Sequence, residues 1–237
     1  MCEGPDAGST APSVLALPDA QALADLETFV GRARRVDPDG ACRLVATGPV
    51  LAAYVSPVHG GGGPTVLGLR VLALAAPVDL DATVALAALL DRFPRVRPAS
   101  GAASPGAATD ADRAVLPVPP VSAVATWAGV TPPRSGWDAV GLLDAPALRE
   151  SAARGVREIA DGVPGEAAAL AVAQLRARVW GRPLTPDLSD VPAGTAFAAD
   201  ALGFLDDAEP VALYRAGPWV RATTRRGHVL ARRSSLL

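Results

Sequence analysis

The stretch VALYRAGPWVRATTRRGHVLARR, residues 211–233, alternates apolar and polar residues and contains two turn dipeptides, Gly217-Pro218 and Arg226-Gly227. Alternation with a period of two is typical of a β-strand that has one buried face. Glycine tolerates positive φ and proline cannot donate to a ladder, so both dipeptides suit turns. The stretch therefore predicts a three-stranded antiparallel meander.

Two-residue turns at those dipeptides fix which residues lie opposite one another. The first turn predicts three pairs: Ala216 with Trp219, Tyr214 with Arg221, and Leu213 with Ala222. The second turn predicts three more: Arg225 with His228, Thr223 with Leu230, and Arg221 with Arg232. Directly opposed residues share a face of the sheet, and a slip of one residue would exchange the two faces.

This register sorts the meander into an apolar face and a basic-aromatic face. The apolar face collects Val211, Leu213, Val220, Ala222, Thr224, Val229 and Ala231. The other face carries the candidate partner-binding residues, which are Tyr214, Trp219, Arg221, Arg225, His228 and Arg232. Arginines on one face repel unless an anion lies between them. That anion could come from a partner, or from Asp206, Asp207 or Glu209, which precede the meander.

Charge is unevenly spread over the 237 residues. All 22 cations are arginine, and six of them follow residue 210 with no acid among them, a local charge of +6 in a chain whose net charge is −2. Such asymmetry can mark an interaction surface. The aromatic rings and guanidinium groups of this face could also bind single-stranded nucleic acid. The preceding 210 residues, however, carry −8 and would repel a polyanion. Nucleic acid is therefore the alternative partner and protein the preferred one.

Residues 18–93 predict an α-β-β-β-α unit behind a flexible leader, residues 1–17. Asp19 is a suitable N-cap for a helix whose apolar residues recur at helical spacing. Strands are expected at 42–47, 50–56 and 65–75. A second helix is expected over 82–93, capped by Asp79 or Asp81 and ended by Pro94.

Residues 94–117, rich in Pro, Ala, Gly and Ser, are predicted to be a flexible linker. The second unit, residues 118–237, begins with a short helix at 119–130. Helices follow from Asp144 to about Gly162, from Gly165 to Trp180 and over 193–205. The meander ends the chain, so the fold class is α+β.

The loop WAGVTPPRSGW, residues 127–137, is a second candidate surface. Trp127 and Trp137 bracket two prolines and Arg134, a composition that could accept a peptide. In a chain with only ten aromatic residues, the same tryptophans could instead anchor the loop onto the body of the protein.

No motif indicates catalysis. The run HGGGGP lacks the lysine and following helix of a phosphate-binding loop, and His59 and His228 have no ligands at metal-binding spacing. Ser56 near His59 is only close in sequence, and Cys42 lies in an apolar strand. We expect no catalytic residue, metal or cofactor. The acidic start and the lack of a long apolar run indicate a cytoplasmic protein without a membrane span.

Four stretches resemble an uncharacterised protein family of high-GC Gram-positive (actinobacterial) bacteria. They are VLAAYVSPVHGGGGPTVLGLR, WAGVTPPRSGW, FAADALGFL and WVRATTRRGHVLARR. The resemblance covers both units and implies no functional residue, because that family has no assigned activity. The sequence thus predicts a non-enzymatic interaction or regulatory protein that docks a protein partner through the basic-aromatic face. A weak nucleic-acid binder is the alternative, and an enzyme with a site built from scattered residues is the third hypothesis.

Overall fold

The computed structural model describes residues 13–98, 113–162 and 169–232, and confirms the predicted α+β class. Eight strands form one antiparallel sheet in the order β5-β2-β3-β4-β11-β10-β9-β8. Their bounds are β2 Ala41–Thr47, β3 Val50–Val58, β4 Thr65–Ala73, β5 Leu80–Ala85, β8 Asp138–Leu143, β9 Val211–Ala216, β10 Trp219–Thr224 and β11 Gly227–Arg232.

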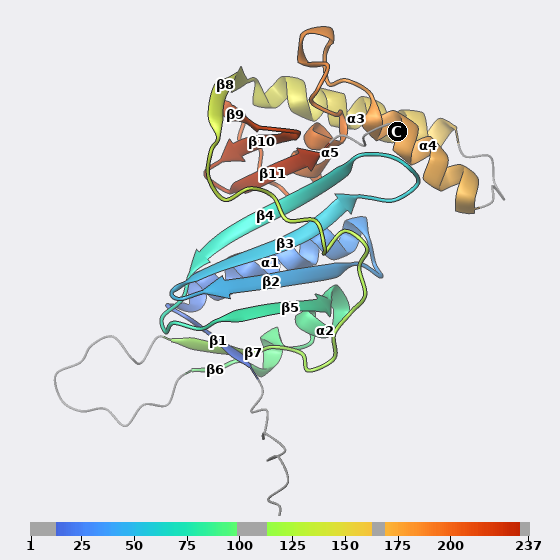
Figure 1. Cartoon of the computed structure of the whole chain (residues 1–237). Coiled ribbons are helices and arrows are strands. Elements are labelled where there is room, and N and C mark those ends of the chain that lie inside the picture. Colours follow the sequence, from blue (N-terminus) through green and yellow to red (C-terminus); the bar gives the residue numbers. More distant parts are fainter. Residues whose placement is uncertain (1–12, 99–112, 163–168, 233–237) are drawn as a thin grey trace, which may run out of the picture.

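The sheet consists of two meanders joined by their last strands. Strands β2, β3 and β4 come from the first half of the chain and β9, β10 and β11 from the second, and β4 pairs with β11 (Figure 1). Leu69 lies opposite His228 and Leu67 opposite Leu230 at this junction. The predicted division of the chain into two units stays a prediction, but both halves contribute to one continuous sheet.

Helices cover one face of this sheet, which we call the helix face. They are α1 Ala20–Val36, α2 Leu86–Leu90, α3 Ala145–Asp161, α4 Ala169–Gly181 and α5 Gly194–Ala201. The predicted caps of two helices are confirmed, since Asp19 accepts a hydrogen bond from the Ala22 amide and Asp144 from the Ala147 amide. Gly68 lets α5 approach β4, because a Cβ there would lie 2.1 Å from a methyl carbon of Leu202.

The opposite face is crossed by residues 118–137, which we call the strap (Figure 1, yellow-green in front of the sheet). The helix predicted at 119–130 is wrong, because this segment has only turns and irregular backbone. Pro119 and Pro120 have no backbone N–H to donate, and the Ala123 amide donates to the Thr83 carbonyl of β5 instead of to its own segment.

The helix predicted over 82–93 is also wrong in its first part. Residues through Ala85 form β5 against β2, and only the short α2 and a single 3₁₀ turn at Phe93–Arg95 follow. Thr83 and Val84 favour a strand because both are β-branched. Asp81 does not cap a helix; its carboxylate pairs with Arg43 on the neighbouring strand. The three strands predicted before this segment are confirmed.

A second, three-stranded sheet contains residues predicted to be leader and linker. It has the order β1-β7-β6, with β1 Val14–Leu17, β7 Ala114–Pro117 and β6 Arg97–Pro98. Leu15, Leu17 and Leu116 are fully buried in the main core, so apolar burial orders these ends of the two segments. Residues 1–12 of the leader and 99–112 of the linker lie outside the described residues.

The C-terminal meander confirms the first predicted hairpin and corrects the second. Ala216 pairs with Trp219 and Tyr214 with Arg221, as expected. In the second hairpin Thr224 pairs with Gly227, so the turn lies at 225–226 and Arg221 faces Leu230, not Arg232.

The side chain of Thr224 explains the earlier turn. Its hydroxyl donates to the Gly227 carbonyl and accepts from the Arg226 amide. Gly227 then lies in the strand, where a Cβ would come 2.6 Å from the Phe204 ring. Because this shift moves each partner by two residues, the apolar and basic-aromatic faces stay as predicted.

Two further elements in the second half, α5 and β8, differ from the sequence expectations. The helix over α3 is confirmed, while α4 is described from Ala169 and its predicted start at 165–168 lies outside the described residues. The helix expected over 193–205 is the shorter α5. Strand β8, which pairs with β9 at the edge of the sheet, was not predicted.

Candidate functional site

The two surfaces predicted separately lie on the same face of the sheet. Trp219 and Leu230 of the basic-aromatic face and Trp127 of the strap belong to one buried apolar cluster, which also contains Leu67 and Leu69. Trp219 is only 5% exposed and Trp127 only 4%. The strap therefore covers part of the basic-aromatic face, which was predicted from the sequence to be exposed, and the tryptophans anchor the strap there.

Arg221 lies where the strap meets the C-terminal meander. The carbon at the centre of its guanidinium is 4.5 Å from the centroid of the Trp137 ring and 4.6 Å from that of Tyr214. Burial lowers the pKa of Arg221 below its usual range. Its Nε is buried without a hydrogen-bond partner, and no carboxylate among the described residues pairs with it. Two aromatic rings therefore pack against the Arg221 guanidinium, where a half-buried arginine would be expected to have a carboxylate partner.

The other predicted cations of the last hairpin have different surroundings. Arg225 pairs with Glu209 at 2.9 Å, and its side chain is 86% exposed. His228 is half-buried on the face of the sheet that the strap crosses, which we call the strap face. Its Nδ1 lies 3.1 Å from the Thr223 hydroxyl. Arg232 is exposed at the far end of β11, opposite Trp219. Of the cationic candidates, Arg221 and His228 are therefore the two that lie together.

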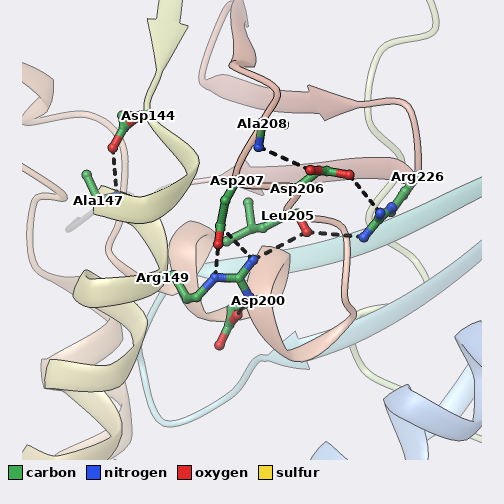
Figure 2. Close-up of polar contacts among 9 residues, drawn as sticks. All are labelled: Asp144, Ala147, Arg149, Asp200, Leu205, Asp206, Asp207, Ala208 and Arg226. Carbon is green, nitrogen blue, oxygen red and sulfur yellow. Dashed lines mark hydrogen bonds and ion pairs between the residues drawn. The ribbon is translucent and has the colours of Figure 1, made fainter.

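The acids before the meander neutralise some arginines internally. Arg226 donates to Asp206 at 2.8 Å, and Arg149 of α3 holds both Asp200 and Asp207 at 2.9 Å (Figure 2). These acids therefore supply internal anions to Arg149 and Arg226, and none of them pairs with Arg221.

An ion pair on β2 and β5 fixes the strap. The Arg43 guanidinium makes two hydrogen bonds to the Asp81 carboxylate, at 2.9 and 2.7 Å, and donates to the Ala128 carbonyl of the strap at 2.6 Å. The bond from Arg43 lowers the pKa of Asp81, and the same bond raises the pKa of Arg43. Arg43 thus joins the first meander to the strap.

Beside the strap, the same face of the sheet is open as a groove of about 370 Å³, which we call the strap groove. Apolar side chains from four strands line it: Val45, Val50, Ala52, Leu69, Val71 and Leu230. Val50 and Val71 are each 46% exposed. The polar residues around it are Thr47, Tyr54, Arg134, Arg221 and His228, so no acid lines it.

The charge that His228 brings to the strap groove depends on whether its imidazole is protonated. Burial, followed by the nearby positive charges of Arg221 and Arg70, lowers its pKa below the usual range. Its imidazole is therefore neutral at pH 7, and the groove owes its positive charge to Arg134 and Arg221. A bound anion would favour the protonated ring.

The residues considered for catalysis do not form a constellation. The Ser56 hydroxyl donates to backbone carbonyls, those of Val58 and Val66, and His59 contacts the Ser56 carbonyl rather than its hydroxyl. Burial raises the pKa of Cys42 to about 12, which keeps the thiol protonated. In the part of the chain that the structure describes, no three His, Cys, Asp or Glu side chains could hold a metal ion together, and no helix is long and apolar enough to cross a membrane.

Sequence reasoning identified the cationic wall of the groove and missed its floor. The floor comes from the first meander, where Val45, Ala52 and Leu69 alternate with residues buried on the helix face. Alternation in 43–47 and 50–54 was the available signal, but it does not reveal that β4 pairs with β11. Only that pairing brings the apolar strands beside Arg221.

Comparison with family models gives two matches of unassigned role. Residues 10–115 match a domain of unknown function, DUF8010, and residues 132–236 match a second one, DUF8185. This agrees with the resemblance to an uncharacterised family. No curated protein matches the chain.

Among solved structures, the chain is similar to bacterial sliding clamps. A DNA polymerase sliding clamp from Caulobacter crescentus is 14% identical with a TM-score of 0.45, and the alignment covers 94% of this chain and 66% of the clamp. The clamp from Pseudomonas aeruginosa, solved with a ligand, is also 14% identical, with a TM-score of 0.43 and coverages of 94% and 64%. The chain thus spans just under two thirds of the length of these clamps.

Proposed function

We propose that this protein is a non-enzymatic interaction protein and that a partner protein docks in the strap groove. The observation that carries the proposal is that the two faces of the sheet are not covered to the same extent. Packed helices cover one face, whereas the strap leaves an apolar groove on the other with Val50 and Val71 each 46% exposed. Exposed, contiguous apolar surface rimmed by polar groups is typical of a docking site.

Charge favours a protein partner over nucleic acid. Arg225 and Arg226 are already paired with Glu209 and Asp206, so the hairpin offers few cations for a phosphate backbone. An apolar floor with one or two cations at its edge suits a peptide. Cytoplasmic location and actinobacterial origin remain predictions from the sequence.

The test selects random displayed heptapeptides on the wild-type protein and then measures their affinity for two variants. Val71→Asp places a carboxylate on the groove floor. Val140→Asp makes the same change at a valine that is 38% exposed on the edge strand β8, outside the groove. We expect the selected peptides to bind wild type and Val140→Asp alike and to lose about tenfold or more affinity for Val71→Asp. Peptides that bind Val71→Asp as tightly as wild type would contradict the proposal.

A second arm tests the nucleic-acid alternative. Fluorescence polarisation with single- and double-stranded oligonucleotides at two salt concentrations should give no saturable binding. Binding at low salt that is lost when Arg221, Arg225 and Arg232 are changed to Glu would favour nucleic acid instead.

A further inference from the structure

We infer that the strap groove takes the C-terminal end of a partner polypeptide, with its carboxylate on Arg221 and apolar side chains along the floor. This inference rests on the proposed function, because it assigns the chemistry of the occupant of the same groove. Three features of the groove support it: the order of the lining residues, the state of Arg221 and the direction in which the groove runs.

The lining residues follow the order of the strands. Arg221 comes from β10, Leu230 from β11, Val71 from β4, Ala52 from β3 and Val45 from β2. The floor of the groove thus runs across five neighbouring strands, with Arg221 at one end and apolar side chains on the other four, while Arg134 lines it from the strap. With strands about 4.8 Å apart, the path crosses about 19 Å of sheet, and it also moves four residues along β4, because Leu230 pairs with Leu67 whereas Ala52 pairs with Val71. The path is therefore about 23 Å long, the length of about seven extended residues.

Arg221 differs from Arg43 and Arg70, two other half-buried arginines of the sheet. Arg43 pairs with Asp81 and Arg70 with Asp25, each at 2.7 Å, and their side chains are 18% and 19% exposed. Arg221 packs against rings, has an unbonded buried Nε and lacks an acid partner among the described residues. Rings interact with the flat faces of a guanidinium, so its N–H donors, which lie in its plane, remain suited to a carboxylate.

The position of the rings favours a chain end over an internal acid. Tyr214 belongs to β9, the strand beyond Arg221, and Trp137 ends the strap at the same place. A peptide that runs along the floor from β2 toward β10 therefore reaches the Arg221 guanidinium first, and the rings of Tyr214 and Trp137 lie beyond it. Its carboxylate can reach Arg221 most simply if the chain ends there, which is the mode of recognition known as terminal carboxylate capture.

The open form of the groove favours a peptide over a fatty acid. Val50 and Val71 of the floor are each 46% exposed, so one side of a bound molecule would face solvent. A peptide can present its backbone groups to that solvent and to Arg134 on the strap. A hydrocarbon chain would leave much of its surface in water.

The experiment uses a labelled hexapeptide, Gly-Ser-Gly-Val-Leu-Val, as the free acid and as the C-terminal amide. Its binding to the full chain is measured by fluorescence anisotropy, with unlabelled dodecanoate as a competitor. We expect the acid to bind and the amide to bind about tenfold more weakly, because the amide loses the charge-assisted hydrogen bonds. Arg221→Gln should make acid and amide equal, while Arg225→Gln, on the same hairpin but paired with Glu209, should keep the difference.

Several outcomes would overturn the inference. They are equal binding of acid and amide to the wild-type protein, no binding of the acid at about 1 mM peptide, and tighter binding of dodecanoate than of the acid. If displayed peptides still depend on Val71 in any of these cases, the terminal-carboxylate inference fails and the docking function stands. If Val71→Asp changes no peptide's affinity, the docking function itself fails.

Discussion

The two faces of the eight-stranded sheet are both apolar, but they are covered in different ways. The helix face is packed by regular helices whose buried residues include Phe29, Trp180 and Leu202. The strap face is covered by one irregular segment that is held by Arg43 and Trp127. A helix brings a wide apolar stripe to a sheet, whereas an irregular strap brings single side chains. The difference leaves one face closed and the other with an open groove.

The largest expected effect compares the same truncation on the two faces. Leu202 and Leu230 are 1% and 2% exposed, on the helix and strap faces respectively. Leu202→Ala should lower the free energy of unfolding by about 4 kcal/mol, and Leu230→Ala by about 2 kcal/mol, because the strap can settle into the space and packed helices cannot. Urea unfolding of both variants measures this. A loss at Leu230 equal to that at Leu202 would mean that the strap is as rigid as the helices.

The second-largest effect is expected when the strap is released from the sheet. Trp127→Ala should remove its main anchor and let the segment around the already exposed Arg134–Ser135 bond leave the sheet. Trypsin should then cleave this bond about tenfold faster or more, because cleavage needs local unfolding. Val121→Ala changes a strap residue that is 74% exposed and serves as the control. Mass spectrometry of timed digests follows this bond. If the bond in Trp127→Ala is cleaved at the wild-type rate, Trp127 does not hold the strap.

A smaller effect concerns the ion pair beneath the strap. Because the bond to Arg43 lowers the pKa of Asp81, its contribution is present above the ordinary aspartate range and is lost as pH falls through the lowered value. Asp81→Asn should therefore lower the free energy of unfolding by about 0.5 kcal/mol at pH 7, since Asp81 is largely exposed. Urea unfolding at pH 2 should show no difference from wild type. A difference that persists at pH 2 would show that the charge of Asp81 is not the cause.

The smallest effect is a pH dependence on the strap face. His228 has a lowered pKa because burial, Arg221 and Arg70 disfavour its charged form. The unfolded chain then binds more protons than the folded one, so the stability from neutral His228 is complete above pH 6.5 and falls as pH drops below it. His228→Gln should flatten the decline in unfolding free energy between pH 7 and pH 5. Equal slopes in the two proteins would contradict the burial of His228.

Local pattern was sufficient to predict much of the fold. Asp19 and Asp144 marked two helix starts, and alternation from Val211 to Arg232 gave the meander and both of its faces. The second turn was misplaced because Arg226-Gly227 matches a turn dipeptide, while the hydroxyl of Thr224 stabilises a turn one residue earlier. Leu15, Leu17 and Leu116 order segments whose composition indicated flexibility.

The candidate site was only half predictable for a physical reason. Its cations lie in one continuous stretch, so alternation could place Tyr214 beside Arg221. Its floor depends on the contact between β4 and β11, which are separated by more than 150 residues. The first part of the strap, residues 119–130, was mistaken for a helix because small apolar residues dominate it. Its path is fixed by contacts with distant residues such as Arg43 and Thr83.

The most direct measurement is a nuclear magnetic resonance titration of the full chain with the free-acid hexapeptide. Resonances of the Val50 and Val71 methyl groups, the Trp137 indole and the Arg221 Nε–H should shift together and saturate. The methyl groups of Val156, which is 48% exposed on α3, should not move. Shifts at Val156 with none at Val71 would contradict a partner site on the strap face.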